Sequence, residues 1–246
     1  VVCDDFPLRT AAERILYVKL LNAGQICTTV DHVYVPRRRV GAFVEHARAI
    51  VPRRYPRLQS PDYTSIVDAR SFERLVAALD DARERGAQVI NLLAGPPWDA
   101  ATRKISPHLV LDAPAASALM QREIFGPILP VLAYDTLDEV VERINAGARP
   151  LALYPFSHDA RRIELLLERV MSGGVSINDA LFHVGQHDLP FGGIGESGMG
   201  HYHGREGFQT FSKLRPVFHQ SRWATTRLLY PPYGKVAERL LAFLMR

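Results

Sequence analysis

Cysteine is scarce in this sequence, since only Cys3 and Cys27 occur among 246 residues. Two cysteines cannot build the disulfide framework of a small secreted protein, and the chain has no signal-like start. A reducing cytoplasm is therefore the compartment that the sequence predicts.

Long apolar runs are also missing. No stretch reaches the roughly 18 apolar residues that suggest a membrane span, so we expect none. The net charge of +4 comes with arginine runs at Arg37–Arg39 and at 53–57. Because Pro36, Pro52 and Pro56 flank these runs, they predict solvated loops and no nucleic-acid partner.

Phosphate and metal motifs are absent as well. No GxGxxG follows the first expected strand, and the run 188–207, with seven glycines in twenty residues, lacks the ending of a P-loop. Its glycines predict a constrained loop that a backbone or a ligand approaches closely. His183 and His187 are four residues apart, but without HExxH we predict no metal, and we expect His183 to fix a loop by hydrogen bonding.

Helix and strand patterns alternate along most of the chain. This alternation predicts an α/β fold with a largely parallel sheet flanked by helices. Helices are expected over residues 8–21, 40–51, 71–85, 135–145 and 159–170, with Ser71 as a cap candidate. Strands are expected over residues 30–35, 88–93, 108–112, 151–156 and 175–178, and in a segment ending at Tyr134. We expect a catalytic domain over 1–200 and a C-terminal segment over 201–246, with an exposed strand at 213–220 and a tail helix at 234–246.

Cys27 lies in Asn22-Ala-Gly-Gln-Ile-Cys27, between an expected helix and an expected strand. The thiolate is the nucleophilic form of cysteine, and at a pKa of about 8.5 only a small fraction is ionised near neutrality. Gly24 permits a sharp turn, and nearby backbone N–H groups would face an oxyanion on an attacked carbonyl. The alternative is that Cys27 is one more small buried apolar residue, which this stretch alone favours.

Three motifs in fixed order favour the interpretation of Cys27 as a nucleophile. They are Asn22-x-Gly24-Gln25-x-Cys27, Glu123-Ile-Phe125-Gly-Pro and Pro190-Phe191-Gly-Gly-x-Gly-x-Ser-Gly. Together they resemble the catalytic half of an aldehyde dehydrogenase. The residues Pro61-Asp-Tyr63 and Tyr230-Pro-Pro-Tyr233 are similar to the class 3-like branch. Within that branch, the PDYTSIV stretch from Pro61 and the tail Gln220-Ser-Arg-Trp223 most resemble bacterial coniferyl aldehyde dehydrogenases.

The resemblance implies oxidation of an aldehyde, coniferyl aldehyde-like and aromatic, to the acid with NAD or NADP. It implies that Cys27 attacks the aldehyde to give a thiohemiacetal, and that hydride transfer then leaves a thioester for hydrolysis. It also implies that Glu123 accepts hydrogen bonds from the nicotinamide ribose and that Phe125 packs near the ring. Asn178 and Phe191 would belong to the aldehyde pocket. Asn22, Gly24, Gln25 and His183 would support the loops.

The resemblance further implies parts that would precede Val1: the cofactor-binding domain, the general-base glutamate and the asparagine of the oxyanion site. Glu13 and Glu196 are expected to be surface carboxylates, and the 246 residues to be poorly active alone. The family's strand after the glycine-rich loop pairs across subunits, so 213–220 is expected to be an oligomerisation strand, most simply of a homodimer. A second hypothesis is a truncated dehydrogenase-like fold that acts as a non-catalytic binding or assembly module.

Overall fold

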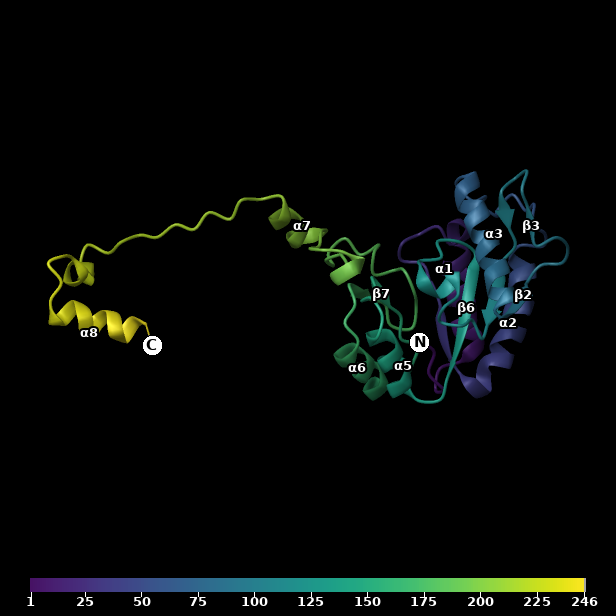
Figure 1. Cartoon of the computed structure of the whole chain (residues 1–246), viewed down its shortest axis with the longest axis horizontal. Coiled ribbons are helices and arrows are strands. Elements are labelled where there is room, and N and C mark those ends of the chain that lie inside the picture. Colours follow the sequence, from purple (N-terminus) through teal and green to yellow (C-terminus); the bar gives the residue numbers. More distant parts are fainter. Residues whose placement is uncertain (246) are drawn as a thin grey trace. The chain divides into compact units, whose positions relative to one another are not determined.

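The structure, a computed structural model, describes residues 1–245 and divides into two units, Val1–Thr210 and Phe211–Arg246. Figure 1 labels their elements. The helices of the first unit are α1 (Leu8–Leu20), α2 (Val40–Arg54), α3 (Ala69–Glu84), α4 (Ala118–Gln121), α5 (Leu137–Asn145), α6 (Ala160–Arg169) and α7 (Gly204–Thr210). Its strands are β1 (Val33–Pro36), β2 (Gln88–Asn91), β3 (Trp98–Asp99), β4 (Lys104–Ile105), β5 (His108–Leu111), β6 (Ile128–Tyr134), β7 (Ala152–Leu153) and β8 (Gly174–Val175). Short 3-10 turns lie at Leu21–Gly24, Arg37–Arg39 and Gly195–Ser197.

The main sheet has four strands in the order β1-β6-β5-β2. Strands β1, β6 and β5 are parallel, with Val33 opposite Val131 and Leu109 opposite Leu129. The expected α/β fold with a largely parallel sheet is confirmed. Strand β2 runs antiparallel to β5, because the chain between them forms the small β3-β4 hairpin and not the crossover helix that a parallel pair needs.

Alternate strand residues face opposite helical layers. Leu109 and Leu129 belong to the core cluster that contains the apolar residues of α1 and α2, whereas Val110 and Ile128 belong to the cluster of α3. Because neighbouring side chains of a strand point to opposite faces, the sheet is covered on both sides. A third cluster joins Tyr134 of β6 to apolar residues of α5 and α6.

Polar caps start three of these helices. Asp68, Thr136 and Asp159 each accept a backbone N–H of the first turn of α3, α5 and α6. Ser71, the predicted cap candidate of α3, is not the cap, and this prediction is wrong. Ser71 supplies the backbone N–H that the Asp68 carboxylate accepts at 2.7 Å, because the helix begins two residues earlier than its apolar pattern.

Helices α5 and α6 lie side by side, close to β7 in Figure 1. Arg169 forms an ion pair with Asp138, and the Asn145 amide donates to the Arg169 carbonyl.

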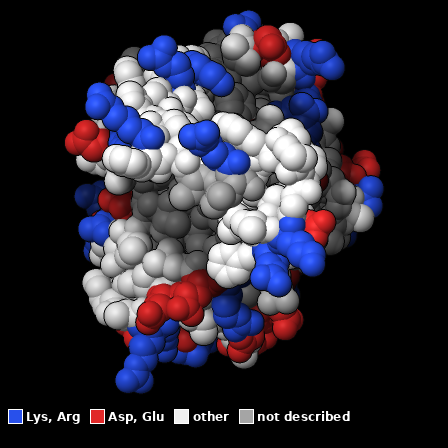
Figure 2. All heavy atoms as spheres, turned by 90° about the vertical axis from the view of Figure 1, so that its left-hand side faces the viewer, with Lys and Arg blue, Asp and Glu red and all other residues white. Residues whose placement is uncertain are grey.

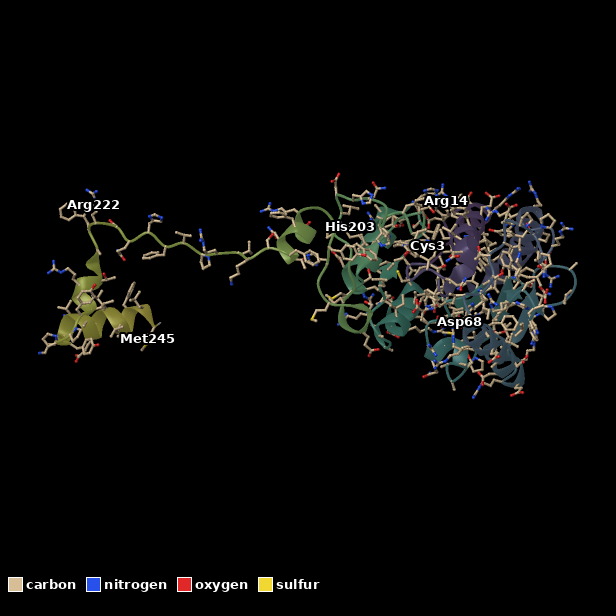
Figure 3. All side chains as sticks on the ribbon, turned by 90° about the horizontal axis from the view of Figure 1, so that it is seen from above. Cys3, Arg14, Asp68, His203, Arg222 and Met245 are labelled. Carbon is tan, nitrogen blue, oxygen red and sulfur yellow. The ribbon has the colours of Figure 1, made fainter. Side chains whose placement is uncertain are left out.

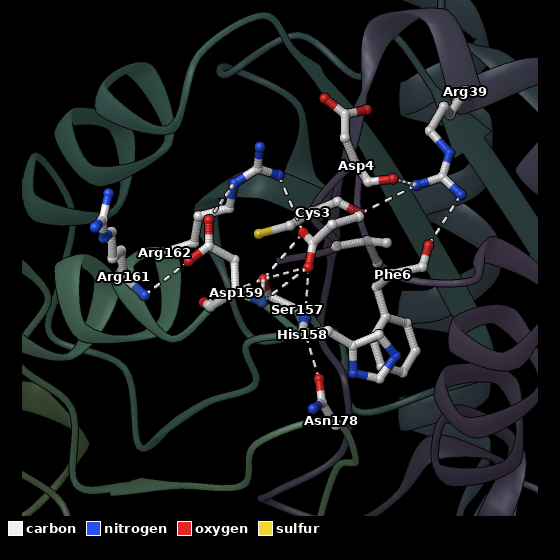
Figure 4. A network of polar contacts seen from close by, with 12 residues as sticks. Cys3, Asp4, Phe6, Arg39, Ser157, His158, Asp159, Arg161, Arg162 and Asn178 are labelled. Carbon is white, nitrogen blue, oxygen red and sulfur yellow. Dashed lines mark hydrogen bonds and ion pairs between the residues drawn. The ribbon is translucent and has the colours of Figure 1, made fainter.

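The turn after β7 is held by the start of the chain, as Figure 4 shows around Ser157. There the Asp5 carboxylate accepts the Ser157 hydroxyl at 2.9 Å, which fastens this turn to the segment that precedes α1.

The second unit contains a 3-10 turn (Thr225–Leu229) and α8 (Lys235–Leu244), with Arg222 and Met245 labelled in Figure 3. The tail helix expected at 234–246 is confirmed, except for Arg246, which lies outside the described residues. The strand expected at 213–220 is not formed within the single described chain, and its expected pairing across subunits stays a prediction. A segment becomes a strand only by pairing its backbone with a neighbour, and residues 213–220 have no such pairing in the described chain.

The described helices include none that is long and apolar enough to cross a bilayer. Figure 2 shows basic and acidic side chains interspersed among uncharged ones.

Candidate active site

The loop that carries Cys27 begins with an unusual turn. Helix α1 ends at Leu20, and the next residues include Asn22, Ala23 and Gly24 with φ of 51°, 51° and 76°. Asparagine and glycine adopt this left-handed region at little cost, whereas alanine does so rarely. The turn reverses the chain and presents the residues that follow it.

Gln25 fastens this turn to a distant segment. Its Nε2 donates to the carbonyl oxygens of Asn22 and Ser65, both at 3.0 Å, and its Oε1 accepts the Val67 N–H at 2.9 Å. The Asn22 amide donates in turn to the Gln25 carbonyl at 3.2 Å. The side chain of Gln25 thus uses both its donor and its acceptor to hold the loop.

Cys27 itself is exposed, whereas Cys3 is buried, and both thiols are free. The residues after Cys27 turn inward: the Tyr154 hydroxyl donates to the Thr28 carbonyl at 2.6 Å, and the Thr29 hydroxyl donates to the Val18 carbonyl at 3.2 Å. Burial raises the pKa of the Tyr154 phenol. The sulfur is therefore accessible on a loop whose flanks are fixed.

The segment containing Glu123 and Phe125 packs directly on this loop. A Cβ atom at Gly24 would lie 2.3 Å from the carbonyl oxygen of Gly126, so the two backbones touch. The Ile124 N–H donates to an Asp31 carboxylate oxygen at 3.0 Å, and Arg74 donates to the Ile124 carbonyl at 2.7 Å. Phe125 lies between these contacts with φ of 49°.

Four ionisable groups surround Glu123, whose side chain is exposed. Partial desolvation and the Asp31 carboxylate raise the pKa of Glu123, while Arg74, Lys19 and Arg122 lower it. Burial opposes the charge of Asp31, yet its His32 partner, the Lys19 ammonium and the Ile124 N–H hold its pKa below the usual range. Glu123, the acid that would bind a ribose, therefore lies among charged groups that shift its pKa in opposite directions.

Lys19 is the most unusual member of this group. Its side chain is 1% exposed, and its Nζ has no hydrogen-bond partner among the described residues. Burial lowers the pKa of Lys19 to about 8, while Asp31 and Glu123 raise it.

An aromatic wall leads from the loop to the glycine-rich segment. The ring centroids of Tyr154 and His183 are 5.9 Å apart, and those of His183 and Phe191 are 6.2 Å apart. His183 shares a hydrogen bond with the Ser176 hydroxyl at 3.0 Å, and burial lowers its pKa. Phe191 exchanges two backbone hydrogen bonds with Tyr202, both at 2.8 Å.

Asn178 has a different environment from that of a freely accessible pocket residue. Its side-chain oxygen accepts the Ser157 N–H at 2.8 Å, a contact visible in Figure 4, and its carbonyl accepts a hydrogen bond from Arg14. With φ of 61°, Asn178 adopts a left-handed backbone conformation.

The structure thus brings most of the predicted site residues together. Cys27 is joined to the Glu123 segment through Gly24, and to Phe191 through Tyr154 and His183. His187 contacts the ring of His203, and in the described part of the chain no three His, Cys, Asp or Glu side chains are grouped to hold a metal.

The two acids near the ends of this region have other roles. Glu13 pairs with Arg9 four residues earlier, and Glu196 is exposed within the glycine-rich run.

Sequence reasoning missed Lys19, Asp31, Arg74 and Tyr154. One signal was available, because Lys19 falls on the apolar stripe of α1 with Ile15 and Leu16, where a charge requires an explanation. The contact of Asp31 with Ile124 spans 93 positions in the chain and leaves no local pattern.

Comparison with known proteins agrees with this geometry. The model of the aldehyde dehydrogenase family matches residues 1–217, and the chain belongs to this family. Among curated relatives, it is 47% identical over 242 residues to a probable coniferyl aldehyde dehydrogenase of Pseudomonas aeruginosa, covering 98% of this chain and 50% of that protein.

Two further relatives extend the comparison. The chain is 35% identical over 238 residues to a dimeric NADP-preferring aldehyde dehydrogenase of Canis lupus familiaris, covering 94% of this chain and 50% of that protein. A solved structure of the substrate-bound state of Staphylococcus aureus AldH matches with a TM-score of 0.84 and 34% identity, over 99% of this chain and 52% of that chain. The chain therefore spans about half the length of the relatives that it matches.

Proposed function

We propose that the protein oxidises aldehydes to carboxylic acids with NAD or NADP, and that Cys27 is the nucleophile. The observation that carries this proposal is the position of an exposed thiol three residues after a left-handed turn whose backbone packs directly against the segment of Glu123. Membership of the aldehyde dehydrogenase family supports the reaction class.

The chemistry of Cys27 follows from its thiolate. The sulfur attacks the carbonyl carbon, a C–S bond forms, and an electron pair moves to the oxygen, where backbone N–H donors near Cys27 would stabilise it. Loss of the former aldehyde hydrogen as hydride leaves a thioester. Water then cleaves this thioester, which releases the acid and restores the thiol.

The residues beside Cys27 fit a nicotinamide cofactor. When bound, this cofactor supplies an acceptor for the hydride. Glu123 presents an exposed carboxylate that can accept both ribose hydroxyls, and Phe125 would lie against the ring. Asp31 and Arg74 fix the backbone of Ile124 between them, which would preserve the spacing of the two residues.

An apolar aromatic aldehyde suits the wall formed by Tyr154, His183 and Phe191. The name of the Pseudomonas aeruginosa relative supports coniferyl aldehyde as the first substrate to test. We propose that coniferyl aldehyde is oxidised with a higher kcat/KM than acetaldehyde, because burial of its ring against this wall contributes binding energy.

The test compares two cysteine variants of the complete gene product that contains this chain. Cys27→Ala is expected to abolish NAD(P)-linked oxidation of coniferyl aldehyde. Cys3→Ala is the matched control and is expected to retain activity, because burial raises the pKa of the Cys3 thiol and keeps it from reacting. Unchanged oxidation by Cys27→Ala would refute the proposal.

We also propose a homodimer in the cytoplasm. The dimeric relative and the exposed apolar side chains of the second unit support association. These side chains include Leu214, Val217, Phe218, Trp223, Tyr233, Phe243 and Leu244. Light scattering is expected to give twice the mass of one gene product, and a monomer at all concentrations would refute association.

A further inference from the structure

Lys19 is a buried charged residue whose charge makes no direct contact, within the described part of the chain, that would stabilise the fold. Helix α1 directs the side chain into the interior with Ile15 and Leu16, and its Nζ lacks a hydrogen-bond partner among the described residues. Removing an ammonium from water without direct partners opposes folding, and a methionine of similar length would fill the same space without that cost. The presence of a lysine here calls for a role other than packing.

The surroundings of Lys19 indicate that role. The Lys19 backbone carbonyl would lie 3.0 Å from a Cβ atom built on Gly24. The backbone of Lys19 is therefore close to the turn that precedes Cys27. Two carboxylates, Asp31 and Glu123, are the acidic groups that act on its charge. Asp31 holds the Ile124 N–H, and Glu123 precedes Ile124 in the chain. The buried Lys19 cation is therefore close enough to act on Glu123 and on Asp31, the carboxylate that anchors the backbone next to Glu123.

We propose that Lys19 is a positioning residue whose buried ammonium keeps Asp31 and Glu123 ionised together, so that Asp31 holds the segment and Glu123 accepts the hydroxyls of a nicotinamide ribose. This inference rests on the proposed function. Two carboxylates that share a small region repel each other, and one of them takes up a proton unless a cation compensates. A protonated Glu123 is a weaker acceptor for two hydroxyl donors.

Other charges also face Glu123, and they limit the size of the effect. Arg74 from α3 and Arg122 from the end of α4 favour its ionised form, Asp31 opposes it, and His32 adjoins Asp31. Loss of Lys19 leaves the two arginines in place. We therefore expect a graded weakening of cofactor binding that increases as the pH falls, and not a complete loss at neutral pH.

The experiment measures binding of NAD⁺ and NADP⁺ to the complete gene product by isothermal titration calorimetry from pH 5.5 to 8.5. Lys19→Met is expected to raise the dissociation constant of the cofactor that binds wild type at least tenfold at pH 6, and less at pH 8. Thermal unfolding of Lys19→Met is expected to occur at or above the wild-type temperature, which a merely structural lysine would not show. Lys104→Met, in the distant β3-β4 hairpin, is the matched control and is expected to bind as wild type does.

A double-mutant cycle with Glu123→Gln isolates the coupling. In the Glu123→Gln background, Lys19→Met is expected to have little further effect, because no carboxylate remains at position 123 to be kept ionised. Two results would overturn the inference while leaving the proposed function intact. One is that the losses of cofactor-binding free energy in Lys19→Met and Glu123→Gln add in the double variant. The other is that Lys19→Met has the wild-type dissociation constant throughout the pH range. If Lys19→Met does not fold, Lys19→Gln takes its place with the same expected and contrary results. Wild type that neither binds cofactor nor oxidises aldehyde would overturn both.

Discussion

The hydroxyl of Tyr154 donates a hydrogen bond of 2.6 Å to the carbonyl of Thr28, the residue directly after Cys27. This bond links the start of the aromatic wall to the loop that carries the thiol, across 126 positions of the chain. A shift of either element would change how the sulfur faces a ring bound against the wall. Within the proposed function, the bond would connect substrate binding to the geometry of attack.

Tyr154→Phe tests this connection. Loss of one buried hydrogen bond is expected to lower the free energy of unfolding by about 1 kcal/mol and to lower kcat for coniferyl aldehyde several-fold. Tyr63→Phe is the matched control, because Tyr63 donates a buried hydrogen bond of 2.7 Å to Ile105 in the other core layer. It should lose similar stability in denaturant titrations and retain kcat. Equal kcat values for the two variants would contradict a special role for Tyr154.

Gly24→Ala is expected to disrupt the candidate site. The new methyl group would overlap the Gly126 carbonyl oxygen, and φ of 76° disfavours any side chain. We expect a loss of more than about 2 kcal/mol in the free energy of unfolding and a large fall in kcat/KM. Gly41→Ala near the start of α2, where nothing lies within 4 Å, should instead gain roughly 0.5 kcal/mol. A neutral Gly24→Ala would refute the backbone contact.

Gln25→Glu separates the donor and acceptor roles of this side chain. A carboxylate can still accept the Val67 N–H, but it cannot donate to the Asn22 and Ser65 carbonyls and would repel them. The melting temperature and kcat are both expected to fall. Gln88→Glu, an exposed change at the start of β2, controls for the added charge and should leave both quantities close to wild type.

His108 makes stability depend on pH. Burial lowers its pKa to about 4 in the folded chain, below the usual 6.5, so the unfolded chain binds the proton more readily between these values. Stability is therefore fully present above pH 6.5 and is lost progressively toward pH 4, by an amount on the order of 3 kcal/mol. Urea titrations from pH 4 to 7.5 measure this slope. His108→Leu should flatten it, and an unchanged slope would assign the effect to other groups.

Much of the first unit follows from local patterns. The apolar spacing of residues 8–21 predicts α1 to within a residue, because packing reinforces the periodicity. The strand expected at 151–156 is limited to Ala152–Leu153, because Pro150 and Pro155 flank it and lack the N–H that a longer ladder requires.

The candidate site was predicted less completely. The motifs identified Cys27, Glu123 and Phe191, which the fold brings into one region. The contacts that join them depend on Asp31, Arg74 and Tyr154, whose partners are far away in the sequence. Such pairings arise only when the layers assemble, and for this reason the patterns of single segments did not predict them.

The packing of Gly24 on Gly126 leaves no room for a side chain between the thiol loop and the segment of Glu123. If the proposed function holds, an engineer who wishes to change the size of accepted aldehydes has no side chain to alter between these two segments. Within the proposed function, substitutions at His183 or Phe191 would change the surface that the aromatic wall offers to an aldehyde without altering this backbone contact.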